Sequence, residues 1–351
     1  MTPMRYQLLG GTGLKVSEVC LGTMTFGEEW GFGSAPDECR RILEAYRARG
    51  GNFLDTANKY TEGASERIVG ELVRPDRERW VIATKYSLSM DEQDPCASGN
   101  SRKNLVQSLE RSLRRLGTDY VDLLWVHAWD FTAAPEEVMR ALDDVVRAGK
   151  ALHVGISDAP AWVVARCNTL AELRGWSRFV GLQIEWSLLE RTVERELIPM
   201  AAALGLHVLA WAPLAGGVLT GKYTRGGGAD SLRGAEMNRA RLDERSLAIA
   251  RALDAVADEV GRSPAQVALA WLRGRGVPTT PILGARKVGQ LEDCLGYLDL
   301  TLLPAQVERL DRVSAVPLGF PHEFLERDHV QQAVYGATRG RLELRLPGRT
   351  S

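Results

Sequence analysis

Four titratable side chains lie close to the ends of short apolar runs, and together they could transfer a proton. Asp55, Lys85 and His127 each end or directly follow such a run, and Tyr60 lies in the loop just after Asp55. A desolvated lysine beside a tyrosine stabilises the phenolate and lowers the tyrosine pKa, and an aspartate paired with that lysine keeps it charged. Such a tyrosine can donate a proton near neutral pH, and the histidine can orient the reacting oxygen. Each residue alone has an ordinary structural explanation, whereas their co-occurrence indicates chemistry.

Eight short runs of β-branched and aliphatic residues are the candidate strands that position these side chains. They are nearly continuous rather than alternating, which is typical of parallel strands covered on both faces. The runs lie at residues 19–22, 52–55, 80–84, 121–127, 153–157, 180–185, 207–212 and 281–284. Segments with helical periodicity lie between the runs, and parallel strands need such crossovers.

Helix-end signals mark several of these crossovers. Leu105, Leu109, Leu113 and Leu116 share one helical face, and Gly117 is a candidate stop. Pro135 can open the following helix. Ser65 can cap a helix that carries Ile68 and Leu72, and Ser263 can cap another that begins at Pro264.

Eight strand and helix repeats predict a closed (β/α)8 TIM barrel. An open doubly wound sheet is less favoured, because no Gly-x-Gly-x-x-Gly turn follows the first strand. We expect one barrel domain over residues 1–313, with an amino-terminal hairpin at 5–17, and a carboxyl-terminal tail over 314–351. The active site of such a barrel lies at the carboxyl ends of the strands, and the loops at 23–34, 128–135 and 215–242 are the expected sites of specificity.

Composition excludes several other classes of protein. The 351 residues carry 44 Lys and Arg against 45 Asp and Glu, and the charges form no basic block, so we expect no nucleic-acid partner. No apolar stretch is long enough to span a membrane and no secretion signal opens the chain, so we expect a cytoplasmic protein without a membrane partner. Five scattered cysteines and five histidines show no metal-ligand spacing, so no metal site is expected. The oligomeric state stays open.

The spacing around the four titratable residues resembles the aldo-keto reductases. The motifs are Asp-Thr-Ala-x-x-Tyr-x-x-Gly-x-Ser-Glu at 55–66, Ala-Thr-Lys at 83–85 and Val-His at 126–127. Gly-Ile-Ser-Asp-Ala-Pro-Ala-Trp-Val-Val at 155–164 and Glu-Arg-Glu-Leu-Ile-Pro-Met at 194–200 resemble the aryl-alcohol dehydrogenase-like branch. The resemblance extends from about Tyr6 to Val313. It implies that Tyr60 is the general acid, that Lys85 and Asp55 tune it, and that His127 orients the carbonyl.

The resemblance also implies NADP(H) as cofactor. Ser157, Asp158 and Gln183 match positions that hold the nicotinamide carboxamide, and Trp211 matches the aromatic residue on which the ring stacks. The family commonly has Asn at the position of Asp158, and an ionised Asp can accept a hydrogen bond but cannot donate one. The matching positions for the cofactor are Gly22, Thr23, Met24, Asp55, Ser157, Asp158, Gln183, Trp211, Ala212, Pro213, Leu214, Ala215, Gly216, Lys222, Gly284, Arg286, Gln290 and Asp293.

Two stretches of that set resemble phosphate-binding segments. The loop at 213–222 is rich in glycine, which lets backbone N–H groups approach phosphate oxygens, and Lys222 adds a positive charge. After the eighth run, Gly284 allows close approach at a helix amino terminus, and Arg286 can bind a ribose 2′-phosphate. Arg286 therefore favours NADPH over NADH. Many relatives have an acidic residue and Asn where this chain has Asp293 and Cys294, so the adenine contact of that Asn is lost or replaced.

Three aromatic residues in the loops are candidates for substrate binding. We expect Phe26, Trp30 and Trp129 to be exposed and to suit a flat substrate, although packing against one another would explain them equally well. The leading hypothesis is an NADPH-dependent reductase of a small aldehyde or ketone. Alternatives are a reductase of a nucleotide-linked keto or enoyl sugar in secondary metabolism, and an NADP(H)-binding sensor resembling potassium-channel β subunits. A non-redox barrel enzyme that acts on phosphorylated metabolites is a further alternative.

Overall fold

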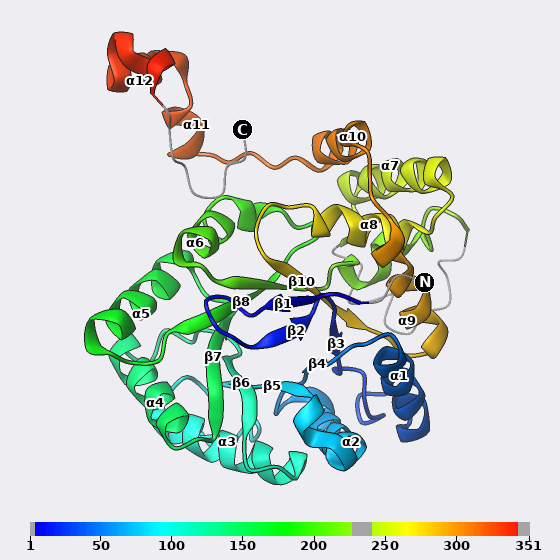
Figure 1. Cartoon of the computed structure of the whole chain (residues 1–351), viewed down its shortest axis with the longest axis vertical. Coiled ribbons are helices and arrows are strands. Elements are labelled where there is room, and N and C mark those ends of the chain that lie inside the picture. The colour runs from blue at the N-terminus through cyan, green and yellow to red at the C-terminus, as the bar shows by residue number, and fades with distance from the viewer. Residues whose placement is uncertain (1–3, 227–240, 343–351) are drawn as a thin grey trace.

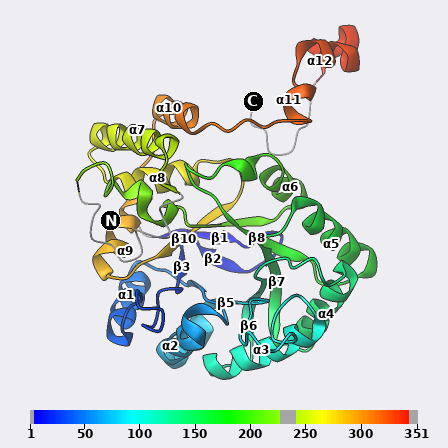
Figure 2. The ribbon, with the colours of Figure 1, turned by 180° about the vertical axis from the view of Figure 1, so that it is seen from behind.

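Eight parallel strands close into a barrel in the order β10-β3-β4-β5-β6-β7-β8-β9, and helices surround it (Figures 1 and 2). The computed structural model describes residues 4–226 and 241–342. The barrel strands are β3 (Cys20–Gly22), β4 (Phe53–Asp55), β5 (Val81–Tyr86), β6 (Val121–Val126), β7 (Ala151–Ser157), β8 (Phe179–Glu185), β9 (His207–Trp211) and β10 (Thr279–Gly284). The predicted (β/α)8 barrel is confirmed, and each of the eight predicted runs overlaps one strand.

The helices that pack around the strands begin and end mostly where the sequence signals lie. They are α1 (Pro36–Ala48), α2 (Ala64–Val73), α3 (Arg102–Leu116), α4 (Pro135–Arg147), α5 (Ala161–Arg174), α6 (Leu197–Leu204), α7 (Glu244–Val260), α8 (Pro264–Arg273), α9 (Val288–Leu295) and α10 (Pro304–Ser314). Helix α3 ends at Gly117, whose φ of 63° is left-handed, as predicted. Ser263 caps α8 by accepting a hydrogen bond from the Gln266 N–H at 3.2 Å.

The predicted cap at Ser65 is wrong. Gly63, with a φ of 84°, precedes α2, and Ser65 lies inside the helix. The Ser65 hydroxyl is fully buried and donates to the Thr23 carbonyl at 2.8 Å. It ties the start of α2 to the end of β3, so its hydrogen bonds serve tertiary packing rather than the helix terminus.

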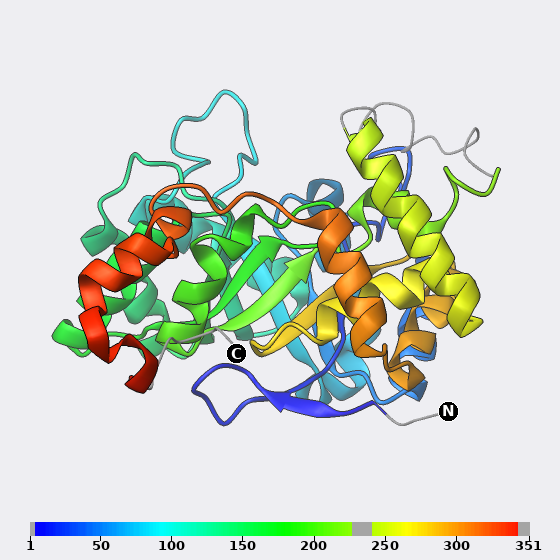
Figure 3. The same ribbon diagram turned by 90° about the horizontal axis from the view of Figure 1, so that it is seen from above.

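A hairpin closes the amino-terminal end of the barrel. Its strands, β1 (Tyr6–Leu8) and β2 (Lys15–Ser17), pair antiparallel as predicted. Leu9 and Val16 are fully buried in a core cluster that also contains Trp125 inside the barrel. Figure 3 shows the hairpin at one end of the barrel and the long loop between β5 and α3 at the opposite end. The end of the barrel that the hairpin leaves open is therefore the end at which the carboxyl termini of the strands lie.

The carboxyl-terminal segment stands apart from the barrel. Helices α11 (His322–Leu325) and α12 (Asp328–Tyr335) extend beyond α6 (Figures 1 and 2). Arg195 Nε donates to the Pro317 carbonyl at 2.8 Å and anchors the start of this segment. The division into a 1–313 barrel domain and a 314–351 tail remains a proposal. The expected specificity loop at 215–242 lies partly outside the described residues, from 227 to 240.

No helix in the described part of the chain is both long and apolar enough to cross a membrane. Within the same residues, no group of three or more His, Cys, Asp or Glu side chains is placed to hold a metal ion.

Candidate active site

The parallel register brings the predicted catalytic residues together at the open end of the barrel. Asp55 lies beside Gly22 at the end of β4, and Lys85 pairs in register with Trp125. Trp125 fills the barrel interior, so Lys85 also faces inward, because residues on neighbouring strands at the same register share a face. Lys85 lies inside β5, one residue before its end, rather than after the strand.

Lys85 is the centre of the site. Its side chain is fully buried, and its ammonium group contacts the Asp55 carboxylate, the Thr56 carbonyl at 2.9 Å and the Tyr60 hydroxyl at 3.0 Å. Burial alone would lower the pKa of Lys85, but Asp55 and Tyr60 raise that pKa above its ordinary value. The lysine is therefore charged, and its three ammonium protons have three acceptors.

Asp55 is held from two sides. One carboxylate oxygen pairs with Lys85, and the other accepts a hydrogen bond from Gln183 Nε2 at 3.0 Å. Gln183 lies on β8, across the barrel from β4. This bond fixes the carboxylate and also holds the Gln183 amide at the bottom of the site.

A strained turn carries Tyr60. Thr61 and Glu62 have φ values of 46° and 50°, a left-handed conformation that non-glycine residues seldom adopt. The Thr61 hydroxyl holds the turn, because it donates to the Phe26 carbonyl at 2.7 Å and accepts from the Ser65 N–H at 2.9 Å. The turn places the Tyr60 hydroxyl on Lys85.

Burial raises the pKa of Tyr60, and the nearby charge of Lys85 only partly opposes this effect. Lys85 therefore lowers the Tyr60 pKa as predicted, but desolvation disfavours the phenolate more than the lysine favours it, so the pKa stays above its ordinary value. Because Lys85 donates to the phenolic oxygen, the Tyr60 proton is left for another acceptor. The geometry makes Tyr60 a neutral hydrogen-bond donor.

His127 follows β6 and faces Tyr60. The two rings meet edge to face, with centroids 5.8 Å apart. Burial, and then the charge of Lys85, lower the pKa of His127 well below its ordinary value, so the imidazole is neutral. Its Nδ1 atom is buried and has no hydrogen-bond partner among the described residues. Tyr60 and His127 can thus present two neutral polar groups to one substrate oxygen.

The residues expected to bind a carboxamide lie beside this group. Ser157 ends β7 and pairs in register with Gln183. Asp158 follows with a φ of 44°, and its carboxylate accepts a hydrogen bond from Trp211 Nε1 at 3.0 Å. Burial raises the pKa of Asp158, and the indole N–H partly opposes the rise. Asp158 therefore fixes the edge of the Trp211 ring, which is a contact that the sequence did not predict.

The end of β9 can cradle phosphate groups. Backbone φ values of 45° at Ala212, 48° at Ala215, 65° at Gly216 and 95° at Gly217 turn the chain repeatedly. A Cβ added at Gly217 would lie 3.1 Å from Lys222 Nζ, so the ammonium group lies against a bare backbone. Gly216 is exposed, and a cation beside a glycine backbone that no side chain covers fits a phosphate group. Pro213 and Leu214 lie between these turns.

The end of β10 supplies the second expected phosphate segment. Gly284 is exposed, and the backbone N–H of Arg286 donates to Gln290 Oε1 at 2.9 Å. The Asp293 carboxylate accepts from Ser263 Oγ at 3.0 Å and from a Gln266 side chain. The side chains of Gln290 and Asp293 are thus engaged within the protein, whereas Arg286 makes no ion pair with the described residues.

At the end of β3, the Thr23 hydroxyl donates to the Asp55 carbonyl at 3.1 Å and Met24 is half-buried. Gly22 pairs in register with Asp55, so the end of β3 borders the Asp55 carboxylate.

The expectation of three exposed aromatic residues is wrong for two of them. Phe26 is fully buried and Trp129 is 7% exposed, because both pack into the layer between strands and helices. Trp30 is half-buried and contacts Tyr60 edge to face, with centroids 6.4 Å apart. Phe32, which the sequence did not single out, packs on Trp30 at 5.9 Å. Trp30 is the aromatic side chain of the three that borders the reactive tyrosine.

Sequence reasoning also missed polar residues inside the Asp55 motif. The Thr56 carbonyl accepts from Lys85. Asn58 is fully buried, and both of its amide atoms lack a hydrogen-bond partner within the described chain. Position alone gives no signal for Asn58, because Lys59, in the same short turn, is 31% exposed.

Comparison with known proteins gives one consistent result. The model of the aldo/keto reductase family matches residues 18–315. The chain is 38% identical over 338 residues to an aryl-alcohol dehydrogenase [NADP(+)] of Phanerodontia chrysosporium, with 90% of this chain and 87% of that protein covered. It is 38% identical over 323 residues to the norsolorinic acid reductase stcV of Emericella nidulans, covering 89% and 82%. It is 34% identical over 343 residues to the aldo-keto reductase ausK of Aspergillus calidoustus, covering 92% and 85%.

Proposed function

Because the chain belongs to the aldo/keto reductase family, we propose that it reduces an aldehyde or ketone to an alcohol with NADPH, and that Tyr60 is the general acid. The observation that carries the proposal is the single ammonium group of Lys85, which contacts both the Asp55 carboxylate and the Tyr60 hydroxyl. This arrangement leaves the phenolic proton directed to a third acceptor. A carbonyl oxygen between Tyr60 and His127 would be that acceptor.

The residues act on the oxygen side of the reaction. NADPH, when bound, would supply a hydride to the carbonyl carbon. As negative charge develops on the oxygen, Tyr60 transfers its proton there, and the O–H bond of the phenol breaks. Lys85 stabilises the resulting phenolate by direct hydrogen bonding, and solvent then returns the proton. His127 donates or aligns from the other side, and it does so as a neutral imidazole because its pKa is depressed.

The donor set at the strand ends fits the cofactor. Ser157, Asp158 and Gln183 would hold the carboxamide, and Trp211, fixed by Asp158 at 3.0 Å, would stack on the nicotinamide ring. The turns after β9 and Lys222 would bind the diphosphate, and Arg286 would bind the 2′-phosphate. The NADP(+) in the name of the Phanerodontia chrysosporium relative supports the same cofactor.

An aromatic carbonyl compound is the substrate class that the rim favours. Trp30 presents its ring beside Tyr60, and Phe32 extends this apolar surface. A flat ring stacked there would bring a carbonyl substituent close to the phenol. The name aryl-alcohol dehydrogenase, carried by one relative, supports this class.

Replacing Tyr60 by Phe tests the general acid. The variant keeps the ring but loses the proton, so we expect kcat for an aromatic aldehyde to fall by about 10²–10⁴-fold, measured from the absorbance of NADPH. Tyr120→Phe is the matched control, because Tyr120 precedes β6 at the closed end of the barrel. Near wild-type turnover by the Tyr60→Phe protein would overturn the assignment. A wild-type protein that binds NADPH but oxidises none in a single turnover with aldehydes would instead be a sensor.

Replacing Arg286 by Ala tests the preference for the phosphorylated cofactor. A guanidinium group that contacts the 2′-phosphate contributes to NADPH but not to NADH. We expect the Kd of NADPH to rise about tenfold or more, and that of NADH to stay within about twofold, both measured by fluorescence titration. Equal weakening of the two cofactors would contradict the 2′-phosphate contact.

A further inference from the structure

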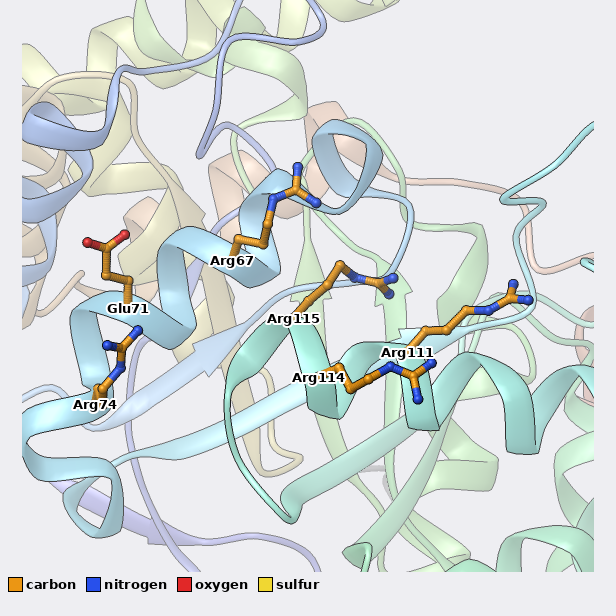
Figure 4. Close-up of a pocket in the computed structure, with 6 residues that line it drawn as sticks. All are labelled: Arg67, Glu71, Arg74, Arg111, Arg114 and Arg115. Atoms are coloured by element: carbon orange, nitrogen blue, oxygen red, sulfur yellow. The ribbon is translucent and has the colours of Figure 1, made fainter.

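A groove of about 480 Å³ between α2 and α3 is lined almost entirely by arginine. Arg67, Glu71 and Arg74 come from α2 and the residue that follows it, and Arg111, Arg114 and Arg115 come from α3 (Figure 4). Five of the six side chains are exposed, and Arg115 is half-buried. The groove lies on the outer surface of the helix layer, between two neighbouring helices.

The groove carries a positive charge that the protein itself does not neutralise. Arg115 pairs with the buried Glu66 at 2.6 Å. By contrast, Arg67, Arg74, Arg111 and Arg114 form no ion pair with any residue in the described ranges, and Glu71 is the one acidic side chain in the lining. The whole chain has a net charge of −1. This cluster of positive charge is therefore local, and the overall composition does not indicate it.

Helix stability explains only part of this arrangement. Arg114 and Arg115 lie in the last turn of α3, where positive charge interacts favourably with the helix dipole. Arg67 lies near the amino end of α2, where positive charge is unfavourable. Arg111 and Arg115 are four residues apart on α3, and like charges at that spacing destabilise a helix. Arg67 lies four residues before Glu71, and opposite charges at that spacing stabilise a helix, whereas Arg111 has no such partner on α3 and no structural explanation on its own helix.

The chemistry of the lining selects one kind of ligand. Guanidinium groups present rigid pairs of N–H donors that match phosphate oxygens. The six lining residues include no aromatic ring on which a nucleobase could stack. Figure 4 shows Glu71 and Arg74 at one end, while Arg67, Arg111, Arg114 and Arg115 extend toward the other.

We propose that this groove is a binding site for a small soluble molecule that carries two or more phosphate groups, held by Arg67, Arg111 and Arg114. With Arg74 at the other end of the groove, four of the lining guanidinium groups have no ion pair within the described residues. Four such groups exceed what one phosphate can engage in bidentate pairs, so clustered phosphates match the site better than a single one. The site is separate from the cofactor segments at the ends of β9 and β10.

The groove also borders the turn that carries Tyr60. A Cβ added at Gly63 would lie 2.8 Å from Arg115 Cδ, and Glu66, the partner of Arg115, accepts from Thr84 Oγ1 at 2.5 Å. Loss of Arg115 would leave the buried Glu66 carboxylate without its counter-ion. The test therefore leaves Arg115 unchanged and removes Arg111 and Arg114, which are exposed.

The experiment is isothermal titration of the full chain with inorganic tripolyphosphate at low salt. We expect binding that weakens as NaCl is added, and a Kd about tenfold or more higher in the Arg111→Ala, Arg114→Ala double variant. The matched control is the Arg174→Ala, Arg251→Ala double variant, which removes the same charge from exposed positions on α5 and α7 and should bind like wild type.

Three results would overturn the proposal. The first is no tripolyphosphate binding by the wild-type protein at low salt. The second is binding that Arg286→Ala abolishes and the groove variant does not change, which would assign it to the cofactor segment. The third is tighter binding of a glutamate-rich peptide of equal charge, which would make the groove a surface for acidic protein segments. Circular dichroism of each variant verifies that the helices are intact.

Discussion

Each end of the barrel holds an ion pair, and the two pairs differ in the other groups that the cation contacts. At the closed end, Arg77 pairs with Asp122 at 2.8 Å and also donates to the carbonyls of Trp80 and Tyr120. Asp122 in turn accepts from the Ile82 N–H at 2.9 Å. At the open end, Lys85 pairs with Asp55 and also contacts Tyr60.

The two pairs differ in the kind of acceptor that receives the remaining N–H groups of the cation. The Arg77 guanidinium donates its remaining N–H groups to the backbone carbonyls of Trp80 and Tyr120, and so holds a loop to the sheet. The Lys85 ammonium donates to the Tyr60 hydroxyl, next to His127, whose buried Nδ1 atom has no hydrogen-bond partner in the part of the chain that the structure describes. Charge therefore fastens backbone at one end, and at the other it contacts the hydroxyl that we propose as the proton donor.

Removing both charges at the open end should produce the largest effect on rate and a small effect on stability. In the Asp55→Asn, Lys85→Met double variant we expect kcat to fall about 10³-fold, because the phenolate loses its counter-ion. We expect the free energy of unfolding to stay within about 1 kcal/mol of wild type or to rise, since neutral groups avoid the desolvation of a buried pair. Steady-state kinetics and urea unfolding measure the two quantities. A large loss of stability would show that this pair also fastens the fold.

Removing both charges at the closed end should do the reverse. In the Arg77→Met, Asp122→Asn double variant the carbonyls of Trp80 and Tyr120 lose their donor. We expect the free energy of unfolding to fall by about 2 kcal/mol, while kcat stays within about twofold of wild type. The same two assays apply. Loss of activity without loss of stability would contradict the separation of the two ends.

A buried histidine at the start of β9 should make the closed end sensitive to acid. Burial lowers the pKa of His207 from its ordinary value of 6.5 to about 4. Between these two values the unfolded chain binds a proton that the folded chain does not, so stability falls as the pH falls. We expect His207 to account for a loss of about 2 kcal/mol between pH 7 and pH 5.

Comparing pH profiles isolates this contribution. His207→Gln keeps a partner for the Thr280 hydroxyl, which lies 2.8 Å from His207 Nε2, and its unfolding free energy should vary less steeply with pH than that of wild type. His329→Gln, on the exposed surface of α12, is the matched control. Parallel slopes for wild type and His207→Gln would refute the assignment.

The smallest expected effect concerns the rim of the open end. Trp30→Ala removes the ring that contacts Tyr60, so KM for an aromatic aldehyde should rise up to about tenfold, with less change for a short aliphatic aldehyde. Trp162→Ala, at a position 58% exposed on α5, is the control. A similar change in KM for both aldehydes would mean that Trp30 shapes the turn rather than binds the substrate.

The barrel and the clustering of Asp55, Tyr60, Lys85 and His127 were predictable because their signals are local. Eight apolar runs predict eight strands, and a residue at the end of a run must face the same rim as its counterparts on neighbouring strands. Asp55, Lys85 and His127 were found in this way. Tyr60 required only its distance from Asp55 along one short turn.

The remaining features depend on packing between distant segments. Phe26 and Trp129 occur in loops, and only the folded loops bury them. The pKa of Tyr60 depends on how far burial outweighs Lys85, which no sequence pattern records. The arginine groove joins residues of two helices, and its charge cancels in the overall balance. Local patterns therefore identified which titratable residues cluster but not what surrounds them.

The pairing of Gly22 on β3 with Gly284 on β10 also governs how the chain can be made. During synthesis the first strand leaves the ribosome long before the last, and until residue 284 has emerged the sheet has two unpaired edges. Open edges are templates for association with other chains. The nascent protein is therefore most dependent on chaperones just before closure, and a chain truncated ahead of β10 should aggregate rather than form a smaller barrel.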